Sequence, residues 1–226
     1  MKKRVIIAVC IFTLLTLTSA HAGHLKWTND GGPYGYYVDR ITLINPENPN
    51  ILYTAVSNLG VFKSEDAGET WKNSILMYDF SIQYITFDPN NSETVIVATT
   101  NGVYITTNGG KNWHTSDIGL TNKIVWFVAI NPVNSNEIYA CTWGGLFKSN
   151  NRGHTWEKVP FFGDRWISAI AIYPNNPNIM YVSTGWVDGD VGIYKSTDKG
   201  EKWTFLGSPS PEKNWTMELG RHVIVG

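Results

Sequence analysis

The chain has 226 residues, of which 42% are hydrophobic and 16% are charged. This composition supports a buried core and excludes a disordered chain. The formal net charge of −1 provides no basic surface for nucleic acid, so we expect no nucleic-acid partner. Aromatic residues make up 13% of the chain beside 21 glycines, which favours short strands and tight turns over long helices.

The first 22 residues are typical of a secretory signal peptide. A basic start, MKKR, precedes the apolar run VIIAVCIFTLLTLT and a small-x-small cleavage pattern that ends at Ala22. Because the apolar run is too short to anchor the mature chain, we expect an exported protein, periplasmic or extracellular, with no membrane span after cleavage. Cleavage removes Cys10 and leaves Cys141 alone, which excludes an internal disulfide in residues 23–226.

An eight-residue motif, called the box below, occurs four times after the signal peptide. Its frame is [ST]-x-[DN]-x-G-x-x-W. The four copies are SEDAGETW at 64–71, TTNGGKNW at 106–113, SNNRGHTW at 149–156 and STDKGEKW at 196–203. Just before each copy stands a Gly followed by an aliphatic and an aromatic residue. Further upstream, two strand-like runs flank a turn proline, which is Pro46, Pro89, Pro132 or Pro174.

Each repeat therefore predicts four short strands. One strand ends at the Pro turn, the second follows it, the third begins at the Gly-aliphatic-aromatic segment, and the fourth begins at the Trp of the box. Four strands in a repeat of about 40–50 residues are the signature of a propeller blade. We expect an all-β fold, a β-propeller of four-stranded antiparallel blades, with four blades at about 38–77, 78–120, 121–162 and 163–207.

The two ends of the repeat array predict an incomplete propeller. In HLKWTNDGG, Trp27 is placed like the Trp of a fourth strand that would close the last blade of a ring. At the other end, residues 208–226 predict the start of a further blade, since RHVIVG resembles a first strand. The alternative is a complete four-bladed ring.

The box resembles the Asp-box, also called the BNR repeat, and the resemblance covers essentially the whole mature chain. The Asp-box occurs in sialidases, sortilin-type receptors, xyloglucan-degrading hydrolases and photosystem II assembly factors. The segments GVFKSEDAGETW and GLFKSNNRGHTW are most similar to the last two groups. The resemblance implies a β-propeller and leaves the activity open, because one fold hosts many activities.

The residue types of the box predict a structural turn between the third and fourth strands. Asp or Asn accepts bonds from backbone N–H groups, and Ser or Thr closes the turn from the other side. The glycine supplies a positive φ, and the Trp covers the sheet and packs between blades. The residues given these structural roles are Ser64, Asp66, Gly68, Trp71, Thr106, Asn108, Gly110, Trp113, Ser149, Asn151, Gly153, Trp156, Ser196, Asp198, Gly200 and Trp203.

A metal site in the box is not expected. Asn108 and Asn151 stand where the other copies have Asp66 and Asp198, so two copies lack the charge that a Ca²⁺ site collects. The histidines show no metal-ligand spacing either. We therefore expect no metal and no cofactor.

The opposite end of each blade is the expected ligand face. Connections alternate between the two ends of a four-stranded meander, so box turns and Pro turns share one end. The loops between the second and third strands, and those between blades, share the other end, called the second face below. The resemblance implies a ligand site there. The candidate residues are Tyr37, Asp39, Tyr78, Asp79, Trp143, Asp164, Arg165, Trp186 and Asp188.

The aromatic residues near the second face have two interpretations. Aromatic side chains beside carboxylates would form a platform for carbohydrate. Alternatively, Trp126 and Trp166 head inner strands and pack in the core.

The sequence does not supply a complete catalytic set. Glycoside hydrolysis needs two carboxylates about 5–10 Å apart, and no spacing selects a pair. The xyloglucanase pattern places a catalytic Asp in a first-blade loop where this chain has Ser57 and Asn58, and the arginine triad of sialidases has no match. The sequence therefore predicts a non-catalytic binding or scaffold module for a protein or glycan. The alternative is a glycoside hydrolase, xyloglucanase-like or sialidase-like, or a truncated fragment of one.

Overall fold

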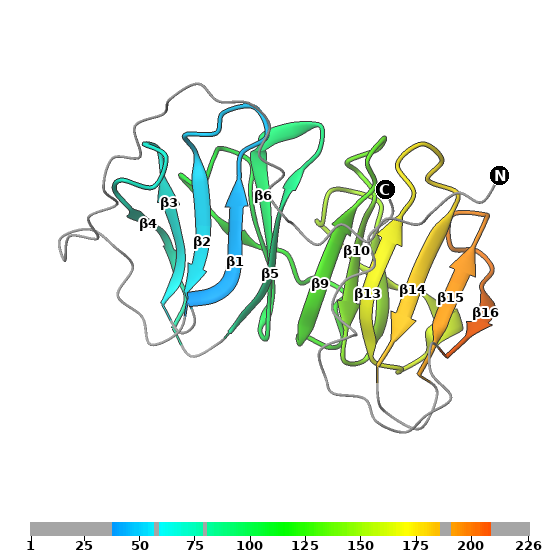
Figure 1. Cartoon of the computed structure of the whole chain (residues 1–226). Helices are drawn as coiled ribbons and strands as arrows, with labels where there is room; N and C mark the ends of the chain where they lie inside the picture. Colours follow the sequence, from blue (N-terminus) through cyan, green and yellow to red (C-terminus); the bar gives the residue numbers. More distant parts are fainter. Residues whose placement is uncertain (1–37, 57–58, 79–80, 186–190, 209–226) are drawn as a thin grey trace.

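The computed structural model describes residues 38–208, except 57–58, 79–80 and 186–190 (Figure 1). The expected signal peptide, the segment around Trp27 and residues 209–226 lie outside these ranges, so the expectations about them stay predictions. Regular structure in the described residues is β-strand apart from one 3₁₀ turn, η1 Pro160–Phe162. Within these ranges no helix is long and apolar enough to cross a membrane.

Four antiparallel sheets of four strands each confirm the expected all-β architecture. In every sheet the strands pair in chain order, and we call the sheets blades 1 to 4. The strands of blades 1 and 2 are β1 Val38–Ile44, β2 Leu52–Val56, β3 Gly60–Ser64, β4 Lys72–Leu76, β5 Ile82–Asp88, β6 Asn91–Thr99, β7 Gly102–Thr106 and β8 His114–Thr115. Those of blades 3 and 4 are β9 Val125–Ile130, β10 Ile138–Thr142, β11 Gly145–Ser149, β12 Glu157–Lys158, β13 Ile167–Ile172, β14 Met180–Thr184, β15 Ile193–Ser196 and β16 Thr204–Gly207.

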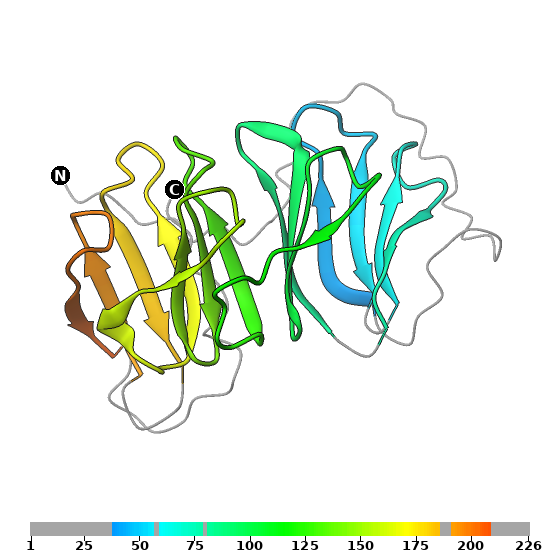
Figure 2. The same cartoon turned by 180° about the vertical axis from the view of Figure 1, so that it is seen from behind.

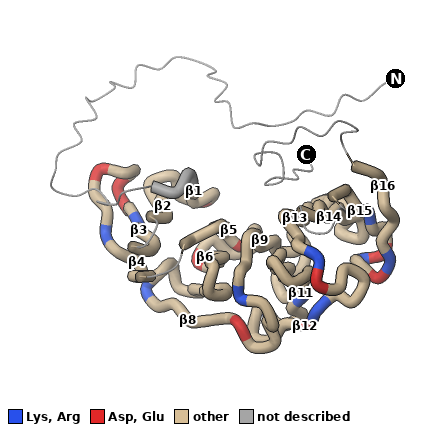
Figure 3. Tube along the Cα trace, turned by 90° about the horizontal axis from the view of Figure 1, so that it is seen from below, with Lys and Arg blue, Asp and Glu red and all other residues tan. Residues whose placement is uncertain are grey.

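The blades follow one another along an arc, which Figure 1 and Figure 2 show from opposite sides and Figure 3 shows from below. The first strands lie on the inner side of the arc, where β5 contacts β1 and β9, and β9 contacts β13. The short fourth strands β8 and β12 lie on the outer side. The first strand of each blade is therefore called its inner strand, and it starts at the second face on the concave side of the arc.

The core consists of separate apolar layers between neighbouring blades. Because side chains alternate along a strand, a strand in the middle of the arc serves two layers at once. All five residues of β10 are buried. Ile138 and Ala140 face blade 2, whereas Tyr139 and Cys141 face blade 4.

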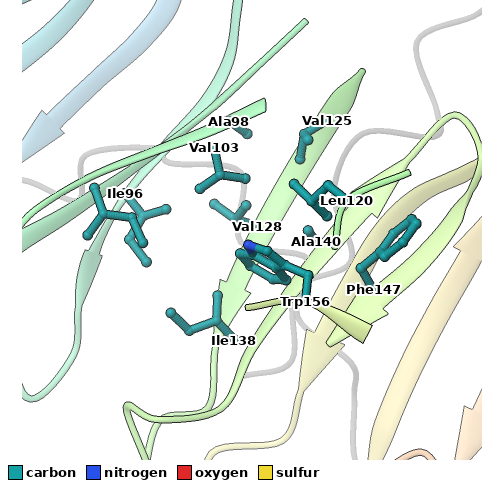
Figure 4. Close-up of a cluster of buried hydrophobic side chains, with 11 residues drawn as sticks. Ile96, Ala98, Val103, Leu120, Val125, Val128, Ile138, Ala140, Phe147 and Trp156 are labelled. Atoms are coloured by element: carbon teal, nitrogen blue, oxygen red, sulfur yellow. The ribbon is translucent and has the colours of Figure 1, made fainter. Parts of the chain in front are cut away.

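The middle layer joins blades 2 and 3 (Figure 4). Ile96 and Val103 of blade 2 meet Val128, Phe147 and Trp156 of blade 3. Trp156 is only 3% exposed, and a buried aromatic ring of this size is a major contribution to such a layer.

Equivalent layers lie on either side of it. Tyr53 and Val61 of blade 1 pack with Ile85 of blade 2, and Leu146 of blade 3 packs with Met180 of blade 4. Each blade therefore depends on its neighbours for burial.

Candidate functional site

The first box, residues 64–71, is a turn closed by its own side chains. The Ser64 hydroxyl donates to Asp66 Oδ1 at 2.7 Å and accepts the backbone N–H of Gly68 at 2.8 Å. The Asp66 carboxylate also accepts the backbone N–H of Thr70 at 2.8 Å, together with the Thr70 hydroxyl. These bonds satisfy the backbone donors of the turn locally.

The other boxes repeat this geometry whether the third residue is Asp or Asn. The Ser196 hydroxyl donates to Asp198 at 2.8 Å, and the Ser149 hydroxyl donates to Asn151 Oδ1 at 2.9 Å. Asn151 Oδ1 also accepts the backbone N–H of Thr155 at 2.9 Å, while its Nδ2 donates to the Thr155 hydroxyl at 2.8 Å. In the second box, the Thr106 hydroxyl donates to Asn108 Oδ1 and accepts the backbone N–H of Gly110, both at 3.0 Å. Asn108 Oδ1 also accepts the backbone N–H of Asn112 at 2.9 Å. The amide therefore replaces the carboxylate within the same turn.

Two successive residues of each box have a positive φ. The box glycines have φ between 81° and 93°, and they are Gly68, Gly110, Gly153 and Gly200. The residue before each glycine also has a positive φ of 58–64°, and these residues are Ala67, Gly109, Arg152 and Lys199. The sequence does not predict a positive φ at this second position, because non-Gly side chains disfavour left-handed backbone. Gly109 in the second copy is the one indication in the sequence that this position has a positive φ.

The box tryptophans use two kinds of hydrogen bond. Trp71 and Trp203 donate from Nε1 to the carbonyl of the glycine in their own box, at 3.1 and 3.0 Å. Trp113 donates instead to Ser74 Oγ in the preceding blade at 3.0 Å, and the Ser74 hydroxyl donates to the Gly110 carbonyl at 2.9 Å. Ser74 thus links blade 1 to the box of blade 2.

The same link recurs between blades 2 and 3. Trp156 Nε1 donates to the Ser116 carbonyl at 3.0 Å, and the Ser116 hydroxyl bonds to the Gly153 carbonyl. Val159 occupies the equivalent position three residues after the box of blade 3. Because Val159 has no hydroxyl, Trp203 uses the glycine of its own box.

The hydrogen bonds of the box keep its carboxylates ionised. The Thr70 hydroxyl, the Thr70 backbone N–H and the Ser64 hydroxyl lower the pKa of Asp66 to about 2. The backbone N–H of Lys202 and the Ser196 hydroxyl lower the pKa of Asp198 as well. A carboxylate held in this way is a poor proton donor near neutral pH.

The boxes lie at the end of the blades that carries the Pro turns. The backbone N–H of Ala67 donates to the Asn50 carbonyl at 2.9 Å, and that of Gly109 donates to the Glu93 carbonyl at 2.8 Å. Blades 3 and 4 have the corresponding bonds from Arg152 and Lys199. The second face is therefore at the opposite end of every strand.

The predicted ligand-face residues have different positions. Tyr37, Asp79, Trp186 and Asp188 lie outside the described residues, and Asp39 lies in β1. Tyr78 follows β4 and is exposed, and Arg165 is half-buried just before β13. Asp164 is paired with Lys158.

Trp143 belongs to a cluster of three tryptophans, Trp126, Trp143 and Trp166. The ring centroids of Trp143 and Trp166 are 5.1 Å apart with an interplanar angle of 19°, so these two indoles are stacked. Trp126 lies 5.8 Å from Trp166 and 6.3 Å from Trp143, tilted by 49° and 41°. Trp143 remains 44% exposed, so part of the cluster is open to solvent.

Each tryptophan comes from a different element at the second face. Trp126 lies in β9 at a β-bulge, where the pairing passes from Phe127 opposite Cys141 to Val125 opposite Thr142. Trp143 lies in the hairpin between β10 and β11, and Trp166 immediately precedes β13. Trp126 and Trp166 do stand at the start of inner strands, as one of the two interpretations had it, but both are only half-buried and both contact the exposed Trp143.

The cluster combines apolar faces with polar groups. The Nε1–H groups of Trp126 and Trp166 are buried without a hydrogen-bond partner, which costs about 1–3 kcal/mol for each group. Two lysines that precede Trp126 and Trp166 in the sequence are ion-paired, Lys123 with Asp117 at 2.5 Å and Lys158 with Asp164. In the part of the chain that the structure describes, no three His, Cys, Asp or Glu side chains gather as a metal site.

The comparisons with known proteins connect the chain with propeller enzymes and binding proteins. No family model matches the chain. A probable oligoxyloglucan-reducing end-specific xyloglucanase from Neosartorya fischeri is 37% identical over 79 residues, which cover 32% of this chain and 10% of that protein. The alignment therefore covers only a short segment of both proteins.

Two solved structures share the fold with most of the described residues. An ancestral GH74 enzyme superposes with a TM-score of 0.63 at 24% identity, covering 79% of this chain and 25% of that chain. An auxiliary nutrient binding protein from Bacteroides thetaiotaomicron superposes with a TM-score of 0.54 at 16% identity, covering 77% and 43%. The chain thus spans about a tenth of the curated relative and a quarter of the GH74 structure, and its fold is that of a β-propeller.

Proposed function

We propose that this chain is an exported Asp-box propeller module that binds a neutral glycan at its second face without cleaving it. The observation that carries the proposal is the cluster of Trp126, Trp143 and Trp166. Aromatic rings that are partly exposed at the mouth of a propeller offer a flat apolar surface to a sugar ring.

The chemistry of the cluster favours a sugar over other ligands. The exposed side of Trp143 can cover the apolar face of a pyranose ring. Lys123 and Lys158 are already paired with Asp117 and Asp164, so these two lysines are less available to an acidic ligand. A neutral glycan fits this combination.

The described carboxylates give less support to catalysis. A retaining or inverting glycosidase needs a carboxylic acid with a raised pKa to protonate the leaving group. Among the described residues, the carboxyl groups with a clearly displaced pKa are Glu65, Asp66 and Asp198, and each pKa is lowered. All three lie at the box end, away from the tryptophans.

The proposal is tested by measuring binding of neutral oligosaccharides by titration calorimetry. Xyloglucan oligosaccharides are the first probe, because the partial relative is named as an oligoxyloglucan enzyme. Trp143→Ala should weaken binding about tenfold, since it removes the stacking surface. Phe205→Ala is the control, because Phe205 is another exposed aromatic residue and lies in the outer strand β16, not in a loop of the second face, so the affinity should stay unchanged. Equal affinity in the wild type and Trp143→Ala would overturn the proposal.

A glycoside hydrolase is the second candidate, favoured by the 37% identity to the xyloglucanase. Release of new reducing ends from xyloglucan by the wild-type chain, lost on Asp164→Ala, would support the hydrolase and exclude pure binding. Failure to bind any sugar of a broad glycan array would leave a protein as the partner.

A further inference from the structure

Gly185 holds a repeated position beside the tryptophan cluster. In blades 2, 3 and 4, the residue after the last one of the second strand donates its backbone N–H to the carbonyl of a residue just before the inner strand. These bonds join Thr100 to Ser81 at 3.0 Å, Trp143 to Ile124 at 3.1 Å, and Gly185 to Trp166 at 2.9 Å. The repeat therefore places one hairpin residue directly against one residue that leads into an inner strand.

In blade 4 this pair has no room for a second side chain. A Cβ atom on Gly185 would lie 2.1 Å from Cε3, 2.4 Å from Cδ2 and 2.6 Å from Cζ3 of Trp166. Cβ contacts this short do not occur in proteins, so the indole would have to move. The backbone of Gly185 is not in the left-handed range, so this glycine is required for space and not for its φ.

Trp166 is also in contact with Trp143 from blade 3. The two indoles are stacked at 5.1 Å, and this contact crosses the boundary between the blades. Trp166 therefore contacts both Gly185 and the ring of Trp143. Any displacement away from Gly185 would change the angle or the distance of the stack.

We propose that Gly185 is a positioning residue of the glycan site, which acts through Trp166 to hold Trp143 as a flat platform. The inference rests on the proposed function of the cluster. Trp143 and Gly185 hold equivalent positions in blades 3 and 4. Blade 3 places an aromatic side chain at this position, and blade 4 places a glycine there, which leaves space for Trp166.

The test is Gly185→Ala, studied with and without Trp166. Stacked indoles give an exciton couplet in far-ultraviolet circular dichroism, and the difference spectrum of Trp143→Ala identifies the contribution of this stack. Gly185→Ala should abolish that contribution and weaken binding of xyloglucan oligosaccharides about tenfold. An unchanged couplet in a variant that folds cooperatively would overturn the inference.

A double-mutant cycle separates this role from a general need for glycine. On a Trp166→Ala background, Gly185→Ala should cause no further change in thermal stability or in affinity, because the ring that it displaces is absent. An equal cost on both backgrounds would show that the backbone alone requires glycine, which overturns the inference.

The two proposals fail in distinguishable ways. A couplet lost in Gly185→Ala, in a protein whose wild type binds no sugar, supports the positioning role and rejects the glycan function. Sugar binding that is equal in the wild type and Gly185→Ala, with the couplet intact, supports the glycan function and rejects the positioning role.

Discussion

Asp and Asn are equivalent at the third position of the box because the turn uses an oxygen and not a charge. Asp66 and Asn151 both accept a backbone N–H four residues further on, at 2.8 and 2.9 Å. The difference between them is that Asp66 has a lowered pKa and Asn151 cannot ionise. The residue therefore affects how folding depends on pH and has little influence on the shape of the turn.

This difference predicts the effect of acid on Asp66→Asn. The pKa of Asp66 is about 2 in the folded chain, whereas the ordinary value of 3.8 applies to the unfolded chain. Ionised Asp66 therefore favours the folded state above pH 3.8. That stability is lost as the pH falls from about 4 toward about 2. Asp66→Asn should keep the neutral-pH stability and show a smaller loss of stability over this window.

The measurement is urea unfolding at pH 7 and at several values between pH 4 and pH 2. Asp66→Ala is the control, because it removes the acceptor and should be destabilised already at pH 7. A pH profile of Asp66→Asn that follows the wild type would contradict the assignment.

At the scale of elements, the fourth strand of one blade holds the box of the next. Ser74 in β4 accepts from Trp113 Nε1 and donates to the Gly110 carbonyl. Ser116, after β8, makes the equivalent link to Gly153. Blades 3 and 4 are joined without such a serine link, since Val159 lies at the corresponding position and packs against the apolar layer.

Ser74→Ala is therefore expected to weaken the contact between blades 1 and 2. It leaves the buried Gly110 carbonyl without this hydrogen bond, which should lower the free energy of unfolding by about 1 kcal/mol. Thr115→Ala is the control, since Thr115 is an exposed residue of a fourth strand and its loss should change stability little. Urea unfolding monitored by tryptophan fluorescence measures both variants, and equal stabilities would contradict the role of Ser74.

At the scale of the whole molecule, stability is distributed over layers between neighbouring blades. Each layer is built by two sheets, so the chain behaves like a short array in which only neighbours interact. A side chain in the middle layer supports two blades that are each covered on both faces. Its loss should therefore cost more than the loss of an equivalent side chain on the face of blade 1 that packs against no other described blade.

Trp156 and Trp71 provide this comparison at equivalent positions of the repeat. Trp156→Ala should lower the free energy of unfolding by about 3–5 kcal/mol, because Trp156 is 3% exposed in the middle layer. Trp71→Ala should cost less than half as much, since Trp71 is only half-buried. Chemical unfolding of both variants is the measurement. Equal losses would show that the layers do not act separately.

The architecture could be predicted from the sequence because its signals are local and repeated. The prolines, the box and the alternating strands recur in one register, and each box turn is closed by bonds within eight residues, as from Ser64 to Gly68. The left-handed residues Arg152 and Lys199 could not be predicted, because the turn imposes a φ that these side chains disfavour.

The tryptophan cluster depends on contacts that no short segment encodes. The sequence placed Trp143 at the second face, but the stacking of Trp166 requires two adjacent blades and the space at Gly185. The contribution of Trp126 depends on a bulge in β9. Contacts of this kind arise from register and packing between blades, so they appear only in three dimensions.

The bulges at the start of the inner strands give the fold a set of exchangeable positions. The pairing of β5, β9 and β13 skips one residue each, which is Gln83, Trp126 and Ser168. Since these residues have no paired position in the register of the ladder, an amide, an indole and a hydroxyl occupy the same place without shifting the strands on either side. The side chain at this position can therefore differ from blade to blade while the strands of the framework keep their pairing.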